Sequence, residues 1–175
     1  MTCRGKMRLH IGWWLVVVGL CVPTVAWSDW TLKRLPKLQG TSEPCVVESS
    51  PMVMSDGYQD TQVTVTISLQ TVTVKAKAPL DNGFNDIGLQ IDKNDVIKMD
   101  KVVEERSALF AASYSTILEQ IAKGPALVKK GRKPTISTLK LYMRFWPTWP
   151  TKGLQTLDVS LEGFSKAYTE LKTCK

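Results

Sequence analysis

The sequence predicts a mainly β (α+β) fold, an antiparallel β-sandwich or curved sheet with one internal and one C-terminal helix. Two patterns lead to this class. In several short segments rich in β-branched residues, apolar and polar side chains alternate, which is typical of strands with one buried face. In two other segments, apolar side chains recur every three or four residues, as they do along one face of an amphipathic helix. Strands and helices of this kind bury their apolar faces against one another in layers.

The strand pattern is clearest at 62–69 and 71–77, where apolar residues alternate with threonine, serine and lysine. The side chains predicted to face the core there are Val63, Val65, Ile67, Leu69, Val72, Val74 and Ala76. Further strands are predicted at 87–91, 96–99, 102–106, 136–146 and 156–161. In the segment 136–146, the side chains predicted to be buried are Leu139, Leu141, Met143 and Phe145. Turn residues at 81–83 and 92–95 separate neighbouring strands.

The internal helix is predicted to begin after Ser113, whose side chain suits an N-cap, and to end at Gly124-Pro125. Its apolar stripe consists of Tyr114, Ile117, Leu118 and Ile121. The C-terminal helix is predicted from the i, i+3, i+4, i+7 spacing of Phe164, Ala167, Tyr168 and Leu171. Cys174 lies near this second stripe, so a disulfide from Cys174 would attach the helix to the rest of the domain.

Residues 1–28 have the three parts of a cleavable secretory signal peptide. A basic start, an apolar run at 11–22 and small residues before a cut between Ser28 and Asp29 make up the pattern. The apolar run is about a dozen residues, whereas a membrane-spanning helix needs about 20. A retained membrane anchor is therefore the less favoured alternative. We expect an exported chain with an irregular lead-in at 29–60, rich in turn residues, followed by a single β-rich domain at 61–175.

The exported part carries a modest charge. Beyond residue 28, 20 basic and 16 acidic residues remain, which gives a net charge of about +4. This charge is too small to argue for nucleic acid binding. It supports at most a weak, peripheral attraction to anionic lipid or lipopolysaccharide.

Only two of the four cysteines, Cys45 and Cys174, lie beyond the leader. An even count in an oxidising compartment favours a disulfide between them. The single histidine, His10, lies within the leader, so the exported part cannot build a Ser-His-Asp, Cys-His or histidine-ligated metal site. No cofactor or metal is predicted. An enzyme would have to use carboxylate, lysine, serine or tyrosine side chains.

Two segments are candidate binding sites. In the first, Arg144 precedes Trp146 and Trp149, and each tryptophan is followed by a proline that restricts it to extended geometry. Tryptophan rings held on such a stiff segment could stack on sugars or contact a protein partner. The alternative is that the rings cap the hydrophobic core. The second is a basic cluster at a predicted hairpin tip, which could contact phosphates of lipid or lipopolysaccharide, or be a solvated loop. Its residues are Lys129, Lys130, Arg132 and Lys133.

Three weaker patterns are interpreted as chance matches. The acidic turns at 81–86 and 92–95 lack the spacing of an EF-hand calcium loop. Ser137 and Lys140 have the S-x-x-K spacing of penicillin-interacting enzymes, but in a strand they would face opposite sides. Glu104 and Glu105 would likewise face opposite sides of a strand, which is poor geometry for an acid–base pair.

Motifs in the second half of the chain are similar to those of a known family. Leu80-Asp81 leads to Ile-Gly-Leu-Gln-Ile-Asp at 87–92, and the predicted helix at 114–123 closes at Gly124. The ending is Ser-Leu-Glu-Gly-Phe-Ser-Lys-Ala-Tyr at 160–168, followed by Leu171. In this order, over roughly residues 60–172, the chain resembles the invasion-associated locus B proteins. The resemblance implies a small exported bacterial protein with a β-sandwich-like domain, located in the periplasm of a Gram-negative bacterium and without known catalytic residues.

These observations predict a non-enzymatic envelope protein that binds a protein partner or a surface glycan. One alternative is a hydrolase that acts on cell-wall or carbohydrate material through carboxylates, which a carboxylate pair in a deep pocket would favour. A flat aromatic patch would favour the binding protein. The other alternative is a structural accessory subunit of an envelope complex, which would expose a large apolar surface.

Overall fold

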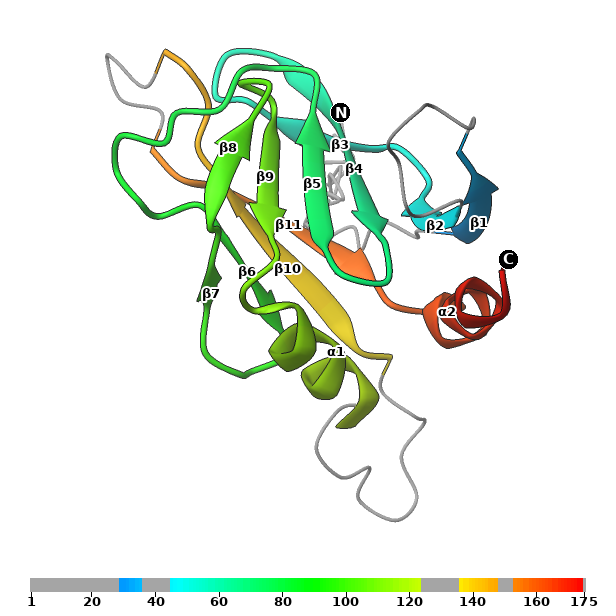
Figure 1. Cartoon of the computed structure of the whole chain (residues 1–175). Coiled ribbons are helices and arrows are strands. Elements are labelled where there is room, and N and C mark those ends of the chain that lie inside the picture. Colours follow the sequence, from blue (N-terminus) through cyan, green and yellow to red (C-terminus); the bar gives the residue numbers. More distant parts are fainter. Residues whose placement is uncertain (1–28, 36–44, 124–135, 148–152, 175) are drawn as a thin grey trace, which may run out of the picture.

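Two antiparallel sheets and two helices form the part of the chain that the computed structural model describes, which is residues 29–35, 45–123, 136–147 and 153–174 (Figure 1). The larger sheet has seven strands in the order β1-β2-β4-β5-β9-β8, with β3 paired to β4. Its strands are β1 (Trp30–Arg34), β2 (Cys45–Ser49), β3 (Met52–Ser55), β4 (Asp60–Ile67), β5 (Val72–Ala76), β8 (Lys101–Val103) and β9 (Ser107–Phe110). The smaller sheet has four strands in the order β11-β10-β6-β7. Its strands are β6 (Gly88–Ile91), β7 (Ile97–Lys98), β10 (Thr138–Met143) and β11 (Gln155–Ser160).

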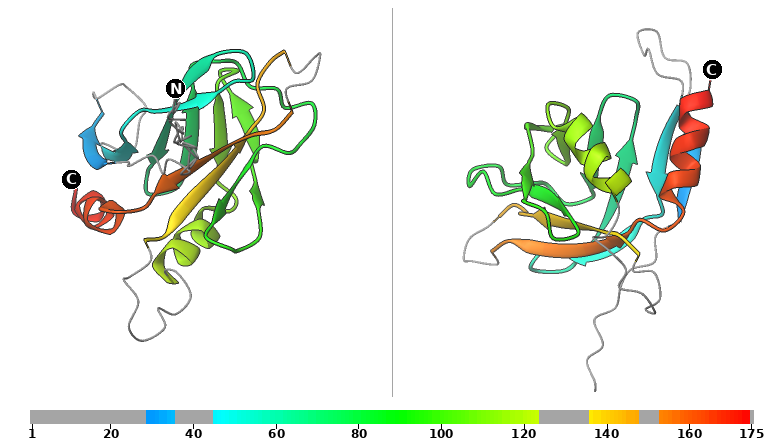
Figure 2. Two further views of the ribbon diagram at one scale, coloured as in Figure 1. Left: turned by 180° about the vertical axis from the view of Figure 1, so that it is seen from behind. Right: turned by 90° about the horizontal axis from the view of Figure 1, so that it is seen from below.

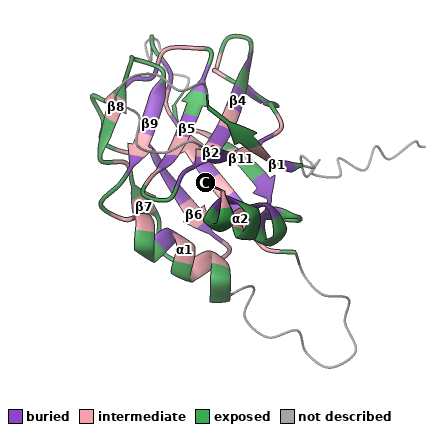
Figure 3. Ribbon diagram, turned by 45° about the vertical axis from the view of Figure 1, so that its right-hand side comes forward, coloured by how far each residue is buried: buried purple, intermediate pink, exposed green. Residues whose placement is uncertain are grey.

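The predicted mainly β, antiparallel fold with two helices is confirmed, and the alternation in the sequence marks the buried faces correctly. The strand residues without exposed surface include Val63, Val65, Ile67, Val72, Val74, Leu141 and Met143. Val65 lies opposite Val74 across β4 and β5, and Leu141 lies opposite Leu89 across β10 and β6. Buried residues of both sheets and both helices belong to one cluster, so the two sheets share a single core. Figure 3 shows these buried positions in purple along the strands.

The prediction for Leu69 was wrong, since this side chain is 41% exposed. Strand β4 ends at Ile67, and the chain then reverses through Ser68. The hydroxyl oxygen of Ser68 accepts hydrogen bonds from the backbone N–H groups of Gln70 (3.1 Å) and Thr71 (3.0 Å). Such a turn ends the two-residue alternation of side chains, so Leu69 no longer points into the core.

The segment 29–60, predicted to be irregular, contains strands β1, β2 and β3 of the larger sheet. Strand β1 pairs with β2, β2 pairs with β4, and β3 pairs with the first half of β4. The prediction failed because these strands are short and lie between turn residues. Pro51 separates β2 from β3, and the Asp56-Gly57 turn joins β3 to β4.

The segment 102–106 was predicted as one strand, but β8 ends at Val103 and the chain turns there. Glu104 and Glu105 have positive φ angles of 51° and 59°, so they belong to the turn and not to a strand. Strand β9, which the sequence did not predict, follows and pairs with both β8 and β5. It was missed because its four residues, Ser-Ala-Leu-Phe, do not alternate in polarity and no glycine or proline marks the turn before them.

Both helices lie where the 3.6-residue periodicity places them. Helix α1 (Tyr114–Lys123) buries Ile117, and helix α2 (Phe164–Thr173) buries Phe164, Ala167 and Leu171. Helix α2 packs against β1 and β2, and Figure 2 shows it lying along these two strands. Among the described residues, no helix is long and apolar enough to cross a membrane.

The predicted partners Cys45 and Cys174 lie at disulfide distance, with their Cα atoms 6.4 Å apart. Cys45 is the first residue of β2, and Cys174 directly follows α2. The pair therefore attaches the end of the C-terminal helix to the larger sheet, as the sequence predicts.

A candidate binding groove beside Trp146

Of the predicted binding residues, Arg144 and Trp146 lie in the described part of the chain. The remaining ones, Trp149, Lys129, Lys130, Arg132 and Lys133, lie outside the described residues. Arg144 and Trp146 follow strand β10 and continue its alternation, because Met143 before Arg144 and Phe145 after it are both buried. Arg144 is largely covered, whereas Trp146 is 65% exposed.

Arg144 is occupied by contacts within the molecule. Its Nε donates to both carboxylate oxygens of Asp86 at 3.0 Å, and its Nη2 forms an ion pair with the same carboxylate. The guanidinium carbon lies 4.3 Å from the centre of the Phe84 ring, in a cation–π contact. The hydrogen bond to Asp86 raises the pKa of Arg144 above its usual value. Arg144 therefore holds the loop that carries Phe84 and Asp86, and we assign it to positioning and not to ligand contact.

Replacing Arg144 by methionine is expected to lower the free energy of unfolding by about 1–3 kcal/mol, because charge-assisted hydrogen bonds are lost while the aliphatic bulk is kept. Lys140→Met is the matched control on the same face of β10. Lys140 forms only an exposed ion pair with Asp158 at 3.6 Å, and such pairs contribute roughly 0–1 kcal/mol. Urea denaturation of both variants measures the difference. Equal losses would contradict the anchoring role of Arg144.

The backbone around Trp146 is fixed although its side chain is exposed. The N–H of Trp146 donates to the carbonyl of Pro79 at 2.9 Å, and Phe145 forms an isolated antiparallel bridge with Leu80. The peptide bond between Trp146 and Pro147 is cis. Because Trp146 is mostly exposed, the alternative that this ring caps the core is wrong. The ring remains available at the surface.

Trp146 and Pro147 line one side of a groove of about 660 Å³. The hairpin between β3 and β4 also lines this groove, and its exposed Tyr58 gives the groove a second aromatic ring. The start of β4 and the segment after β5 complete the lining. The full set of lining residues is Val53, Asp56, Tyr58, Gln59, Asp60, Thr61, Gln62, Lys77, Ala78, Pro79, Trp146 and Pro147.

The hairpin tip that carries Tyr58 is held by its own side chains. The Oδ1 atom of Asp56 accepts hydrogen bonds from the backbone N–H groups of Tyr58 (2.8 Å) and Gln59 (2.9 Å). Gly57 has a φ of 97°, a left-handed conformation that favours glycine at this turn. Ser55 Oγ accepts a further bond from Gly57 N–H at 3.0 Å. The backbone that presents Tyr58 is therefore set before any ligand arrives.

The part of the groove lining that follows β5 is hydrogen-bonded to β4. Thr61 Oγ1 accepts a hydrogen bond from the N–H of Ala78 at 3.1 Å, and Lys77 N–H donates to the carbonyl of Gln62 at 2.9 Å. Sequence reasoning missed Tyr58 and this part of the lining. An aromatic residue beside the Asp56-Gly57 turn was the available signal, because aromatic side chains are uncommon at solvated turn tips.

Within the described residues, no three or more histidine, cysteine, aspartate or glutamate side chains lie close enough together to hold a metal ion, at this groove or elsewhere. In the turn at 81–86, Asp81 Oδ1 accepts a bond from Gly83 N–H, and Asp86 binds Arg144. In the turn at 92–95, Asp92 Oδ1 accepts a bond from Thr138 N–H. These carboxylates stabilise the loops in which they lie.

Comparison with protein-family models, with curated proteins and with solved structures gave no significant match to this chain. The chemistry of the groove is therefore the basis for a functional proposal. The groove has two exposed aromatic rings, several amide and carboxylate groups, and a backbone held by hydrogen bonds. This set of groups suits a ligand that has both apolar faces and hydroxyl groups.

Proposed function

We propose that the chain is an exported, non-enzymatic envelope protein that binds a glycan in the groove between Tyr58 and Trp146. The observation that carries the proposal is the exposure of both rings, 53% for Tyr58 and 65% for Trp146, on one groove with a fixed backbone. Each ring offers an apolar face on which a sugar ring can stack.

The polar lining favours a glycan over a protein partner. Gln59, Asp60 and Gln62 offer donors and acceptors to sugar hydroxyl groups, whereas the centre of a protein–protein interface is depleted in charged groups. Two aspartates and one lysine line the groove, so its own charge is slightly negative. A neutral or cationic glycan therefore fits better than a phosphorylated one.

Location outside the cytoplasm is part of the same proposal. It is supported by the leader pattern at 1–28 and by the Cys45–Cys174 pair, because disulfides persist in oxidising compartments. The resemblance to the invasion-associated locus B proteins supports the periplasm of a Gram-negative bacterium as the compartment.

The test uses a series of oligosaccharides that differ in charge, with binding measured by isothermal titration calorimetry. The probes are neutral chitin fragments, cationic chitosan fragments and anionic phosphorylated lipopolysaccharide core. We expect the neutral or cationic probe to bind. Trp146→Ala and Tyr58→Ala should each weaken binding by roughly ten-fold or more, as residues at the centre of an interface do.

Phe84→Ala is the matched control, since Phe84 is an exposed aromatic residue (58%) that does not line the groove. It should leave binding unchanged. Glycan binding that survives the loss of both groove rings would refute the proposal. A protein partner captured by in-cell crosslinking and lost with Trp146→Ala, without glycan binding, would favour the protein-partner alternative.

A hydrolase remains the second candidate because Asp56 and Asp60 line the same groove. The Oδ1 atom of Asp56 accepts hydrogen bonds from two backbone N–H groups of the hairpin turn, so this carboxylate has a structural role in the turn. Release of reducing ends from the probes by the wild-type protein, abolished by Asp60→Asn, would establish hydrolysis. Binding without release of reducing ends supports the non-enzymatic proposal.

A further inference from the structure

Strand β1 forms one edge of the seven-stranded sheet and pairs only with β2. Ser50 N–H donates to the carbonyl of Asp29 at 2.9 Å, next to the pair Trp30–Ser49 at which the β1–β2 ladder begins. In an antiparallel ladder the hydrogen-bonded residues alternate, so every second residue of β1 directs its backbone groups away from β2. These residues are Trp30, Leu32 and Arg34. No described strand pairs with this outer edge.

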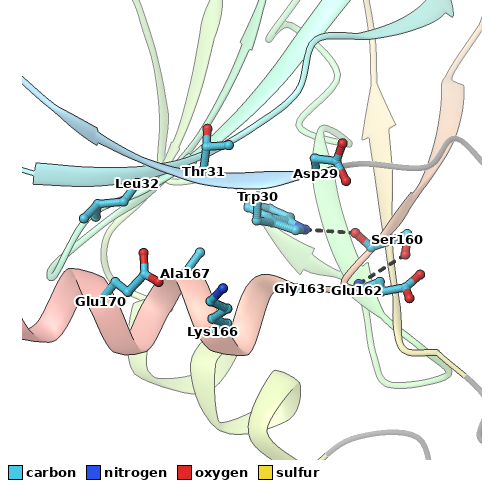
Figure 4. A pocket seen from close by; sticks show the side chains of 10 residues that line it. All are labelled: Asp29, Trp30, Thr31, Leu32, Ser160, Glu162, Gly163, Lys166, Ala167 and Glu170. Atoms are coloured by element: carbon cyan, nitrogen blue, oxygen red, sulfur yellow. Dashed lines mark hydrogen bonds between the residues drawn. The ribbon is translucent and has the colours of Figure 1, made fainter.

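A groove of about 510 Å³ runs along the same strand (Figure 4). One wall is Asp29 together with residues 30–32 of β1, and the other is helix α2 together with the residues just before it, as Figure 4 shows. Buried Trp30 and half-buried Leu32 provide apolar surface in this groove. A strand added at this edge could pair with the outward-facing N–H and C=O groups of β1 and place its side chains in the groove. This arrangement is used in recognition by strand addition.

The two ends of β1 carry opposite charges. Asp29 and Glu162 are exposed where β1 begins, and within the described part of the chain neither forms an ion pair. Arg34 is exposed at the other end and is likewise without an ion-pair partner among the described residues. Lys33 differs, because it binds Glu48 at 2.5 Å. An antiparallel strand of the same sequence would therefore bring unpaired opposite charges together.

The register of such a pairing is fixed by the outward-facing residues. With Leu32 opposite Leu32 of a second copy, Trp30 lies opposite Arg34 of the second copy, and all three positions direct backbone groups to the shared edge. Side chains two residues apart share one face of a sheet, so Arg34 of the second copy enters the groove beside Trp30. There it comes near Glu162, whose carboxylate lines the same groove. Asp29 lies on the opposite face of β1, as Figure 4 shows.

We propose that two copies of this chain associate through β1, so that their seven-stranded sheets join edge to edge around a two-fold axis at Leu32. The occupant of the groove between β1 and α2 is thus the β1 strand of the second copy. A two-fold interface requires a self-complementary surface, and β1 is complementary to itself in both hydrogen bonding and charge. This association is independent of glycan binding at Trp146.

The test is sedimentation equilibrium of protein purified from cells that express the full chain, over a hundred-fold range of concentration. We expect a monomer–dimer equilibrium. Arg34→Glu should raise the dimer dissociation constant at least ten-fold, because it replaces a cation near Glu162 of the second copy with a like charge. Combining Arg34→Glu with Glu162→Lys should restore much of the affinity. Lys101→Glu, a charge reversal on β8 at the opposite edge of the sheet, is the matched control and should have no effect.

Leu32→Pro provides a second variant. The N–H of Leu32 faces the outer edge, so proline there removes a donor from the proposed interface and none from the β1–β2 ladder. A dimer that is lost in Leu32→Pro or Arg34→Glu, with a native circular dichroism spectrum, supports the proposal. A chain that stays monomeric at all concentrations overturns it, as does a dimer unaffected by both variants. Binding of an unrelated extended peptide to a strictly monomeric chain would also overturn it.

Discussion

Trp30→Ala is expected to lower the free energy of unfolding by roughly 3–5 kcal/mol, the range for removing a large buried aromatic side chain. Trp30 is only 8% exposed, and its ring meets that of Phe164 edge-on with centroids 5.1 Å apart. Its indole N–H donates to the carbonyl of Ser160 at 3.0 Å. One side chain therefore connects strand β1 to both the end of β11 and the start of α2, and its loss would affect all three.

Urea denaturation followed by circular dichroism measures this effect. Trp146→Ala is the matched control, because Trp146 is the same residue type at an exposed position and should change stability by less than about 0.5 kcal/mol. Trp30→Phe separates the two contributions. It keeps a ring against Phe164 but leaves the buried carbonyl of Ser160 without its donor, which should cost about 1–3 kcal/mol. Equal losses for Trp30→Ala and Trp146→Ala would show that Trp30 does not join these elements.

The parts of the fold that could be predicted are those whose burial follows a local period. Strands β4, β5 and β10 alternate over five residues or more, and α1 and α2 repeat an apolar stripe over ten. Each of these elements buries one face, so the pattern in the sequence and the burial in the structure have the same physical cause. The cysteine pair could be predicted for a different reason, since only two of the four cysteines lie after the predicted leader at 1–28.

The parts that could not be predicted depend on partners far away in the sequence. Strand β9 has four residues that do not alternate in polarity, and β1 lies in a segment rich in turn residues, so each is a strand because of its neighbours in the sheet. Arg144 looked like a ligand-binding residue, but its partner Asp86 lies 58 positions earlier. The groove is lined by both the hairpin at Tyr58 and Trp146, and nothing in either segment of the sequence indicates that the two line one groove.

Removal of the Cys45–Cys174 link is expected to have an effect on stability as large as that of Trp30→Ala. The two cysteines are separated by 129 positions, so the link closes almost the whole described fold into one loop. Loop-closure entropy alone would give roughly 4–5 kcal/mol for a loop of this length, and loss of a native disulfide from a small domain typically costs about 2–5 kcal/mol. The double variant Cys45→Ala/Cys174→Ala is the appropriate change, because Cys45 is buried at 2% exposure and alanine adds no polar group there.

The comparison that isolates the disulfide uses four samples, the wild-type protein and the double variant, each with and without reductant. Reductant should destabilise the wild-type protein to about the level of the double variant and leave the double variant unchanged. The far-ultraviolet circular dichroism of all four should stay similar before unfolding, because Phe164, Ala167 and Leu171 still bury α2 against the sheet. If the wild-type protein instead shows two free thiols and no response to reductant, the disulfide does not form. Helix α2 would then be held by packing alone.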